Sequence, residues 1–191
     1  AGWFFIIHEI GHALGLKPPH DDGGTGRPTF KELGWIHLAV DYMTVMSYGD
    51  DYNYNLRLYD PATPMIFDVL ALQYLYGKNI STNAGNSNFV INNSNMYITI
   101  WDASGVDLID QSGAAEGWYI ILPNTQLTEL VDTKAGIGLP LSEINLAAPK
   151  SLAWLAGDIE NVVGSGFADH IYGNDLSNDI KGYAGDDLIH G

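Results

Sequence analysis

The end of the sequence repeats with a period of nine residues. Four glycines and three isoleucines mark the repeat: Gly164, Gly173, Gly182, Gly191, Ile171, Ile180 and Ile189. This pattern predicts a parallel β-roll, because the first six residues of each unit can form a turn and the last three a short strand with an inward apolar side chain. Two units complete one coil of such a roll, so turns two units apart lie on the same side.

Aspartates in the repeats indicate calcium binding. The units span 164–172, 173–181 and 182–190, and Asp169 and Asp187 hold the sixth position of the first and third units. These two carboxylates and nearby backbone carbonyls can share one Ca2+ through oxygen ligands. Asn178 holds this position in the middle unit, so one complete calcium site is predicted. The other aspartates are expected to be solvated or to form turns: Asp175, Asp179 and Asp186.

The charge of the chain restricts its partners. Eight basic against 23 acidic residues give the 191-residue chain a net charge of -15. This charge argues against nucleic acid and anionic membranes as partners and favours hard cations. The chain has no cysteine, which excludes disulfides and thiolate metal sites. Its apolar start is too short to span a bilayer and lacks a cationic lead, so we expect no targeting or transmembrane segment.

The hydrophobic pattern predicts an α+β fold. Residues 3–16 are expected to form an apolar, buried helix that a Gly-Leu-Lys-Pro-Pro stretch ends. A second helix is expected to be capped by Thr63, to continue from Pro64 and to end at Gly77. The Asn- and Ser-rich stretch 79–95 predicts a linker or surface turns, with a domain boundary there. Runs of β-branched and aromatic residues predict three strands: 96–101, 118–122 and 127–131.

The first helix carries the residue types of a zinc hydrolase. His8 and His12 are four positions apart, so both imidazoles project from one helix face and can share a Zn2+. Glu9 lies beside that face, and we predict that it takes a proton from the water that attacks a peptide carbonyl. The alternative is a buried helix that contains three titratable groups by chance. The cost of burying unpaired charge disfavours this alternative.

These residues lie within longer patterns that resemble a known family. The string H-E-I-G-H-A-L-G at 8–15 resembles the metzincin motif of zinc proteases, in which Gly15 lets the chain turn toward a third ligand. The string T-V-M-S-Y at 44–48 resembles the Met-turn beneath the metal, with Met46 as support. Tyr48 then matches the displaceable zinc ligand of serralysins. Residues 60–77 resemble the closing helix of a serralysin catalytic domain. With the terminal repeats, the whole chain resembles a serralysin-type zinc metalloprotease.

The resemblance implies a fold, an activity and a location. The implied fold is the lower part of a metzincin catalytic domain over 1–77, the start of a β-rich domain over 78–163 and a calcium-binding β-roll over 164–191. The implied activity is zinc-dependent hydrolysis of peptide bonds in proteins. The implied protein is a monomer that a bacterium secretes by the type I route and that calcium stabilises outside the cell. The twisted sheet that precedes the motif helix in this family is missing from the sequence.

The sequence departs from the family at one metal ligand. The third histidine of the family would stand at position 18, where this chain has Pro18, which offers no side-chain donor. His20 can replace it only if the loop shifts by two residues, which the fixed φ values of Pro18 and Pro19 make difficult. Glu32, 24 residues after His8, is a rival third ligand of the thermolysin-like type. Its surroundings lack the pattern of that class.

The missing ligand leaves a second interpretation open. The chain would then be a catalytically impaired remnant that acts as a calcium-binding β-roll module. This interpretation predicts calcium-dependent folding without proteolysis at any zinc concentration. The stretch 101–107 resembles the strand and turn that open the C-terminal β domain of the family. We interpret its aspartates, Asp102 and Asp107, as turn formers and assign them to no site.

Overall fold

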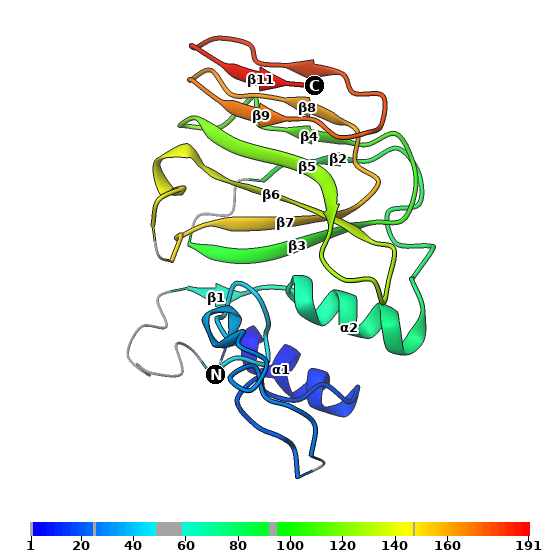
Figure 1. The fold of residues 1–191 in the computed structure, drawn as a ribbon. Coiled ribbons are helices and arrows are strands. Elements are labelled where there is room, and N and C mark those ends of the chain that lie inside the picture. Colours follow the sequence, from blue (N-terminus) through cyan, green and yellow to red (C-terminus); the bar gives the residue numbers. More distant parts are fainter. Residues whose placement is uncertain (1, 25, 49–58, 92–94, 147) are drawn as a thin grey trace.

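The computed structural model describes residues 2–24, 26–48, 59–91, 95–146 and 148–191. Over these residues the chain is an α+β protein, in which a small helical part lies beneath a larger β-sheet part (Figure 1). The described residues include no helix that is long and apolar enough to cross a membrane.

The helices come early in the chain and most strands come late. The helices are α1 (Trp3–Ala13) and α2 (Ile66–Tyr76), with two 3-10 turns, η1 (Ile36–Leu38) and η2 (Leu141–Glu143). The first strands are β1 (Asp60–Pro61), β2 (Asn88–Phe89), β3 (Met96–Asp102), β4 (Leu108–Asp110), β5 (Trp118–Gln126) and β6 (Lys134–Pro140). The last strands are β7 (Leu152–Gly157), β8 (Asn161–Val163), β9 (His170–Tyr172), β10 (Ile180–Lys181) and β11 (Leu188–His190).

The strands form two sheets. The larger has the order β1-β3-β7-β6-β5-β9-β11, and the smaller has the order β10-β8-β4-β2. From β8 onward, successive strands alternate between the sheets. β10 pairs in parallel with β8, and β11 with β9, so that Ile180 lies opposite Val162 and Leu188 opposite His170. The chain therefore completes one coil for every two nine-residue units.

An aliphatic core fills the space between the sheets. Ile109, Ile120, Leu155 and Ile171 are fully buried there, because alternate side chains of each strand point inward. Ile189 occupies the same offset in the last repeat, but it is 43% exposed. β11 forms the edge of the described sheet, so one side of this isoleucine has no neighbouring strand.

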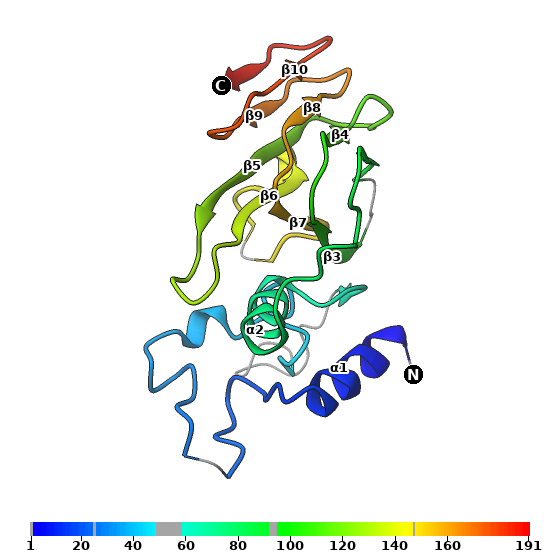
Figure 2. The same cartoon turned by 90° about the vertical axis from the view of Figure 1, so that its right-hand side faces the viewer.

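A second core joins the helical part to the larger sheet. It contains side chains from α1, from the loops around α2 and from β3: Phe4, Ile7, Met46, Met65 and Tyr97. Helix α2 lies between α1 and the sheets in both views (Figures 1 and 2). Trp154 of β7 donates a hydrogen bond from Nε1 to the carbonyl oxygen of Tyr42 at 2.6 Å. This bond fixes the long loop after α1 to the sheet.

Helix α1 is shorter and more exposed than the sequence predicts. It ends at Ala13 rather than at residue 16, and Gly15 then reverses the chain with a φ of +90°. Four large apolar side chains of this helix are at least half exposed: Trp3, Phe5, Ile6 and Ile10. The prediction that the helix is buried on most faces is therefore wrong for the described residues, because they cover only one face of α1.

Helix α2 begins later than the sequence predicts. Its N-cap residue is Met65, whose N–H donates to the Asp68 carboxylate at 2.8 Å. Thr63 does not cap the helix. Its hydroxyl instead accepts a hydrogen bond from Thr99 N at 2.7 Å and so ties this segment to β3. The predicted end of the helix at Gly77, with a φ of +84°, is confirmed.

The strand predictions are partly confirmed. β3 and β5 lie where strands were expected, but residues 127–131 form the turn of the β5–β6 hairpin. The stretch 79–95 contains β2 and is not only a linker, although residues 92–94 lie outside the described residues. The sequence pattern did not indicate β4, β6, β7 or β8.

Candidate metal centre

The two histidines of α1 lie together, with their ring centroids 4.8 Å apart. His8 is buried, and its Nδ1 donates to the carbonyl oxygen of Val45 at 2.7 Å. This bond sets the tautomer, so that Nε2 carries the lone pair. Nε2 of His8 is buried and has no hydrogen-bond partner among the described residues. A buried nitrogen lone pair without a partner fits a metal ligand better than it fits a core residue.

His12 is exposed and completes the pair. Its Nδ1 lies 3.2 Å from the carbonyl oxygen of Leu16, beyond the end of the helix. This contact also leaves Nε2 as the nitrogen available to a metal. Glu9 is exposed on the same helix, next to His8, where water and a substrate can reach its carboxylate.

The segment 44–48 packs directly beneath α1. Met46 is buried, and a Cβ added to Gly11 would lie 2.5 Å from the Met46 sulfur. Glycine at this helix position is therefore what lets the methionine approach. The carboxylate of Asp68 holds the segment from the other side, since it accepts hydrogen bonds from Thr44 Oγ1 at 2.6 Å and from Val45 N at 2.7 Å. Burial raises the pKa of Asp68 to about 6, against the lowering effect of these bonds.

Tyr48 and His20 extend the row of rings that starts at His12. The Tyr48 ring lies 5.0 Å from the ring of His8 and 5.0 Å from that of His20. Tyr48 is 45% exposed, so its hydroxyl can move. Pro18 and Pro19 are buried, and their carbonyl oxygens accept hydrogen bonds from Asp21 N and Phe30 N. The two prolines anchor the loop, while His20 projects from it against Tyr48.

Glu32 does not lie with the histidine pair. Its Oε2 accepts hydrogen bonds from the Thr29 N–H at 2.8 Å and the Thr29 hydroxyl at 2.9 Å, which lower the pKa of this carboxyl. It shares a shallow surface hollow with His20 instead. Within the described ranges, no three imidazole, carboxylate or thiol groups are close enough together to hold a metal ion. The two imidazoles of α1 and the exposed hydroxyl of Tyr48 are thus candidate zinc donors whose rings lie together.

The predicted calcium ligands lie side by side. Asp169 N donates to Asp187 Oδ1 at 3.0 Å. Asp169 is fully buried, and its carboxylate accepts hydrogen bonds from Trp118 N at 2.6 Å and from Ser165 N at 2.7 Å. These bonds occupy lone pairs that a calcium ion would otherwise use.

A second acidic pair was missed by the sequence interpretation. Asp102 and Asp107 are both buried, and three of their carboxylate oxygens accept no hydrogen bond from another described residue. When Asp102 is protonated, it can donate a hydrogen bond to Asp107. Burial, followed by the nearby Asp107 charge, raises the pKa of Asp102 to about 7. Glu160 adds negative charge, and its carboxylate accepts a hydrogen bond from Asp107 N at 2.7 Å. The signal in the sequence was the five-residue spacing of two aspartates at a strand end, which we interpreted as a turn.

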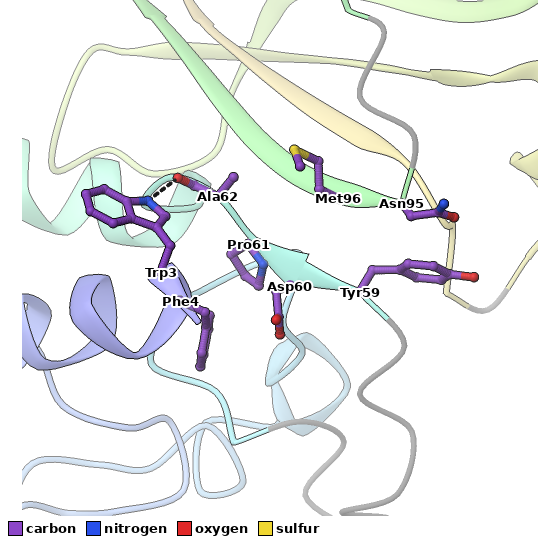
Figure 3. A pocket seen from close by; sticks show the side chains of 8 residues that line it. All are labelled: Trp3, Phe4, Tyr59, Asp60, Pro61, Ala62, Asn95 and Met96. Atoms are coloured by element: carbon purple, nitrogen blue, oxygen red, sulfur yellow. Dashed lines mark hydrogen bonds between the residues drawn. The ribbon is translucent and has the colours of Figure 1, made fainter. Parts of the chain in front are cut away.

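One hollow lies apart from the histidines. It has a volume of about 660 Å³ and opens between the start of α1 and the edge strand β1 (Figure 3). Trp3 closes one side by donating from Nε1 to the carbonyl oxygen of Ala62 at 2.9 Å. Asp60 and Tyr59 of the strand side also line it. None of the candidate zinc ligands borders this hollow.

Comparison with known proteins identifies the relatives of the chain. It is 32% identical over 199 residues to "Serralysin" of Proteus mirabilis, covering 94% of this chain and 37% of that protein. It is 30% identical over 196 residues to "Metalloprotease AprA" of Pseudomonas entomophila (strain L48), covering 92% of this chain and 37% of that protein. The chain belongs with the serralysin-type metalloproteases.

The serralysin-type relationship extends along nearly the whole chain but covers only part of the relatives. The chain spans about 37% of the length of the Proteus mirabilis and Pseudomonas entomophila proteins. No protein-family model matches it. "Serralysin C" of Dickeya chrysanthemi is 29% identical over 150 residues, which are 70% of this chain and 31% of that protein. The comparisons therefore assign the chain to a family of metalloproteases.

Proposed function

We propose that this chain is the zinc-binding and calcium-stabilised part of a secreted, zinc-dependent endopeptidase that cleaves proteins and peptides. The observation that carries the proposal is the buried, partnerless Nε2 of His8 beside His12. The domain organisation follows the resemblance: 1–77 is the lower part of a metzincin-like catalytic domain, 78–163 begins the β-rich domain and 164–191 is an RTX-type calcium-binding β-roll. The names of the metalloprotease relatives support this assignment.

The residues of the centre have different roles in the proposed reaction. His8 and His12 would hold a zinc ion that supplies Lewis acidity at the peptide carbonyl. Glu9 takes a proton from the attacking water and passes it to the leaving amine. Tyr48 packs against His8, and we assign its hydroxyl to hydrogen bonding with the developing oxyanion; its exposure lets it move aside for a substrate. Met46 packs against Gly11 and so sets the distance between α1 and the turn at 44–48.

His20 is our proposal for the third nitrogen ligand. Pro18 has no donor, and His20 is an imidazole outside α1 whose ring contacts Tyr48 of the centre, as the ring of His8 does. We propose that the exposed side chain of His20 turns toward the histidine pair while the buried Pro18 and Pro19 hold the loop backbone in place. Glu32 is disfavoured as the ligand, since its carboxylate is engaged within its own turn.

Calcium would act in the β part of the chain. Asp169 and Asp187 remain candidate ligands, and Asp102 with Asp107 offers the better fit, because its buried oxygens lack partners among the described residues. A bound Ca2+ would compensate the repulsion within this pair. We further propose that the chain is secreted unfolded and folds outside the cell, where calcium is abundant.

Zinc content after dialysis tests the proposed centre. We expect about one zinc per chain, lost on His8→Ala and kept in His37→Ala, which removes an exposed histidine of η1. His20→Ala should weaken zinc binding about tenfold or more, and Pro18→His should strengthen it. Zinc binding that persists in His8→Ala would disprove the centre. Full affinity in His20→Ala would disprove only the third ligand.

The competing function is a calcium-binding module with an impaired protease site. The absence of a three-ligand group among the described side chains favours it. Cleavage of casein by the longer parent protein decides between the two. If that activity is present and Glu9→Ala abolishes it, the impaired-site interpretation is wrong. If casein stays intact at saturating zinc and calcium, the endopeptidase proposal fails.

A further inference from the structure

We propose that an apolar groove beside α2 binds the alkyl chain of a long-chain fatty acid, with Lys17 and Arg27 attracting its carboxylate. The groove has a volume of about 760 Å³, which is within the range of small-molecule sites. It lies between the loop that follows α1, helix α2 and the turn of the β5–β6 hairpin. The proposal is independent of zinc, since His8, His12 and Tyr48 do not line the groove.

The walls of the groove are apolar on all three sides. The loop contributes Phe30 and Trp35, α2 contributes Leu70, and the hairpin turn contributes Leu127 and Leu130. Several large side chains remain open to solvent: Trp35 is 50% exposed and Leu130 is 66% exposed. Apolar side chains gathered around one concavity indicate a binding site, whereas scattered ones do not. A flexible alkyl chain suits this shape because it can follow a groove with three unlike walls.

The charged residues that line the groove favour a ligand with an anionic head group. The chain has 23 acidic and only eight basic residues, yet Lys17 and Arg27 both line this hollow. The Lys17 ammonium donates to the carbonyl oxygens of Asp21 at 2.6 Å and Pro28 at 3.2 Å, which position it, and the nearby Glu32 carboxylate also feels its charge. Asp68 is the acidic residue that lines the groove, and burial raises its pKa to about 6. An amphiphile with an anionic carboxylate is therefore favoured over a cationic one.

The floor of the groove connects it to the turn beneath α1. Thr44 and Met46 line it, and they flank Val45, whose carbonyl oxygen holds His8. An occupant therefore contacts the same turn that orients this histidine. Its binding would change the packing beneath the neighbouring metal centre without contacting the candidate zinc ligands.

Calorimetric titration with sodium laurate tests the proposal, below the micelle concentration and at free calcium low enough to keep the soap dissolved. We expect saturable one-to-one binding, at least about tenfold tighter than that of dodecyltrimethylammonium, which has the same tail and the opposite charge. The double variant Lys17→Gln, Arg27→Gln should lose this preference. Lys181→Gln, which removes a cation of β10 in the other sheet, should keep it.

Two variants block the groove in different ways. Ala71→Trp fills it from α2, and Leu130→Asp places a carboxylate at a lining position that is 66% exposed, so the fold should persist. Both should weaken laurate binding about tenfold or more, with an unchanged far-UV circular dichroism spectrum. The proposal is overturned if laurate does not saturate, if the cationic amphiphile binds equally well, or if Leu130→Asp leaves the affinity unchanged.

Discussion

One residue, Val45, connects the Asp68 carboxylate to His8. The N–H of Val45 donates to Asp68 Oδ2, and the carbonyl oxygen of the same residue accepts a hydrogen bond from His8 Nδ1. Met65 N also donates to Asp68, at the start of α2. A single buried side chain thus caps a helix, fixes a turn and indirectly orients a candidate metal ligand. At the scale of the residue, Asp68 is the most informative position outside the histidine pair.

Replacing Asp68 by asparagine should change the pH dependence of stability. The folded-state pKa of Asp68, about 6, lies above the reference value of 3.8. The folded protein therefore gains stability from holding this proton; the gain is complete below pH 3.8 and is lost as the pH rises to 6. The wild type should therefore lose up to about 3 kcal/mol relative to Asp68→Asn across this window. Urea unfolding at several pH values measures the difference.

The control for this experiment is an aspartate on the surface. Asp186 is exposed, and Asp186→Asn should leave the pH profile parallel to that of the wild type. In Asp68→Asn, the amide oxygen of the introduced side chain can still accept the bonds from Val45 and Met65, and its NH2 group can donate to Thr44, so the fold should persist. Parallel profiles for Asp68→Asn and the wild type would show that the Asp68 carboxyl does not titrate in this window.

At the scale of the element, the sequence predicted what depends on local pattern. The nine-residue period indicated strands at Ile171, Ile180 and Ile189, and these strands are present. β6 was missed because Gly136 and Gly138 interrupt its hydrophobic pattern. Gly136 has a tertiary cause: a Cβ there would lie 2.2 Å from the carbonyl oxygen of Ile121 on the next strand. Such close approach between strands leaves no sign in a single sequence.

The candidate site, like the strands, was predictable only where a local sequence pattern encodes it. Four-residue spacing was sufficient to place His8 and His12 on one face of a helix. The position of His20 against Tyr48 depends on a loop anchored by two buried prolines, which no local pattern encodes. The burial of Asp102 likewise results from strands far along the chain.

Alanine at Gly136 should therefore be costly. The added methyl group meets backbone atoms, which cannot move as a side chain can, and we expect a loss of about 1–3 kcal/mol of unfolding free energy. Gly113→Ala is the matched control, because nothing lies within 4 Å of the added Cβ there. Chemical denaturation of both variants tests the expectation. Equal stabilities would show that β5 and β6 are less closely paired than described.

The buried isoleucines of the roll should contribute unequally. Ile171 is fully buried, so Ile171→Ala should cost about 2–5 kcal/mol through lost burial and a residual cavity. Ile189 is 43% exposed at the same offset, and Ile189→Ala should cost less than about 1 kcal/mol. Thermal unfolding at fixed calcium compares the two. A larger loss at Ile189 would mean that another surface covers β11 in solution.

At the scale of the whole molecule, acidic charge opposes compaction. The net charge of -15 is a general repulsion that any salt screens. The Asp102–Asp107 pair is different, because it is buried between strands and salt in the solvent screens it poorly. A proton on Asp102, whose pKa is raised to about 7, or a cation that enters the site can compensate it. The two sources of repulsion can therefore be separated by comparing calcium with an equal ionic strength of sodium chloride.

Asp102→Asn should make the chain more stable without calcium and less responsive to it. Removing one of two facing carboxylates relieves their repulsion, so the calcium-free Tm should rise by about 2–8 °C. The calcium-dependent rise in Tm should shrink, since stabilisation by a ligand depends on its affinity for the folded state. Asp175→Asn, at an exposed position paired with Lys134 on the surface, should change neither quantity beyond about 1 °C.

Differential scanning calorimetry of the wild type, Asp102→Asn and Asp175→Asn in EGTA, in calcium and in matched sodium chloride tests this prediction. If Asp102→Asn lowers the calcium-free Tm and keeps the full calcium response, the buried pair is held by internal contacts and the calcium acts elsewhere in the roll.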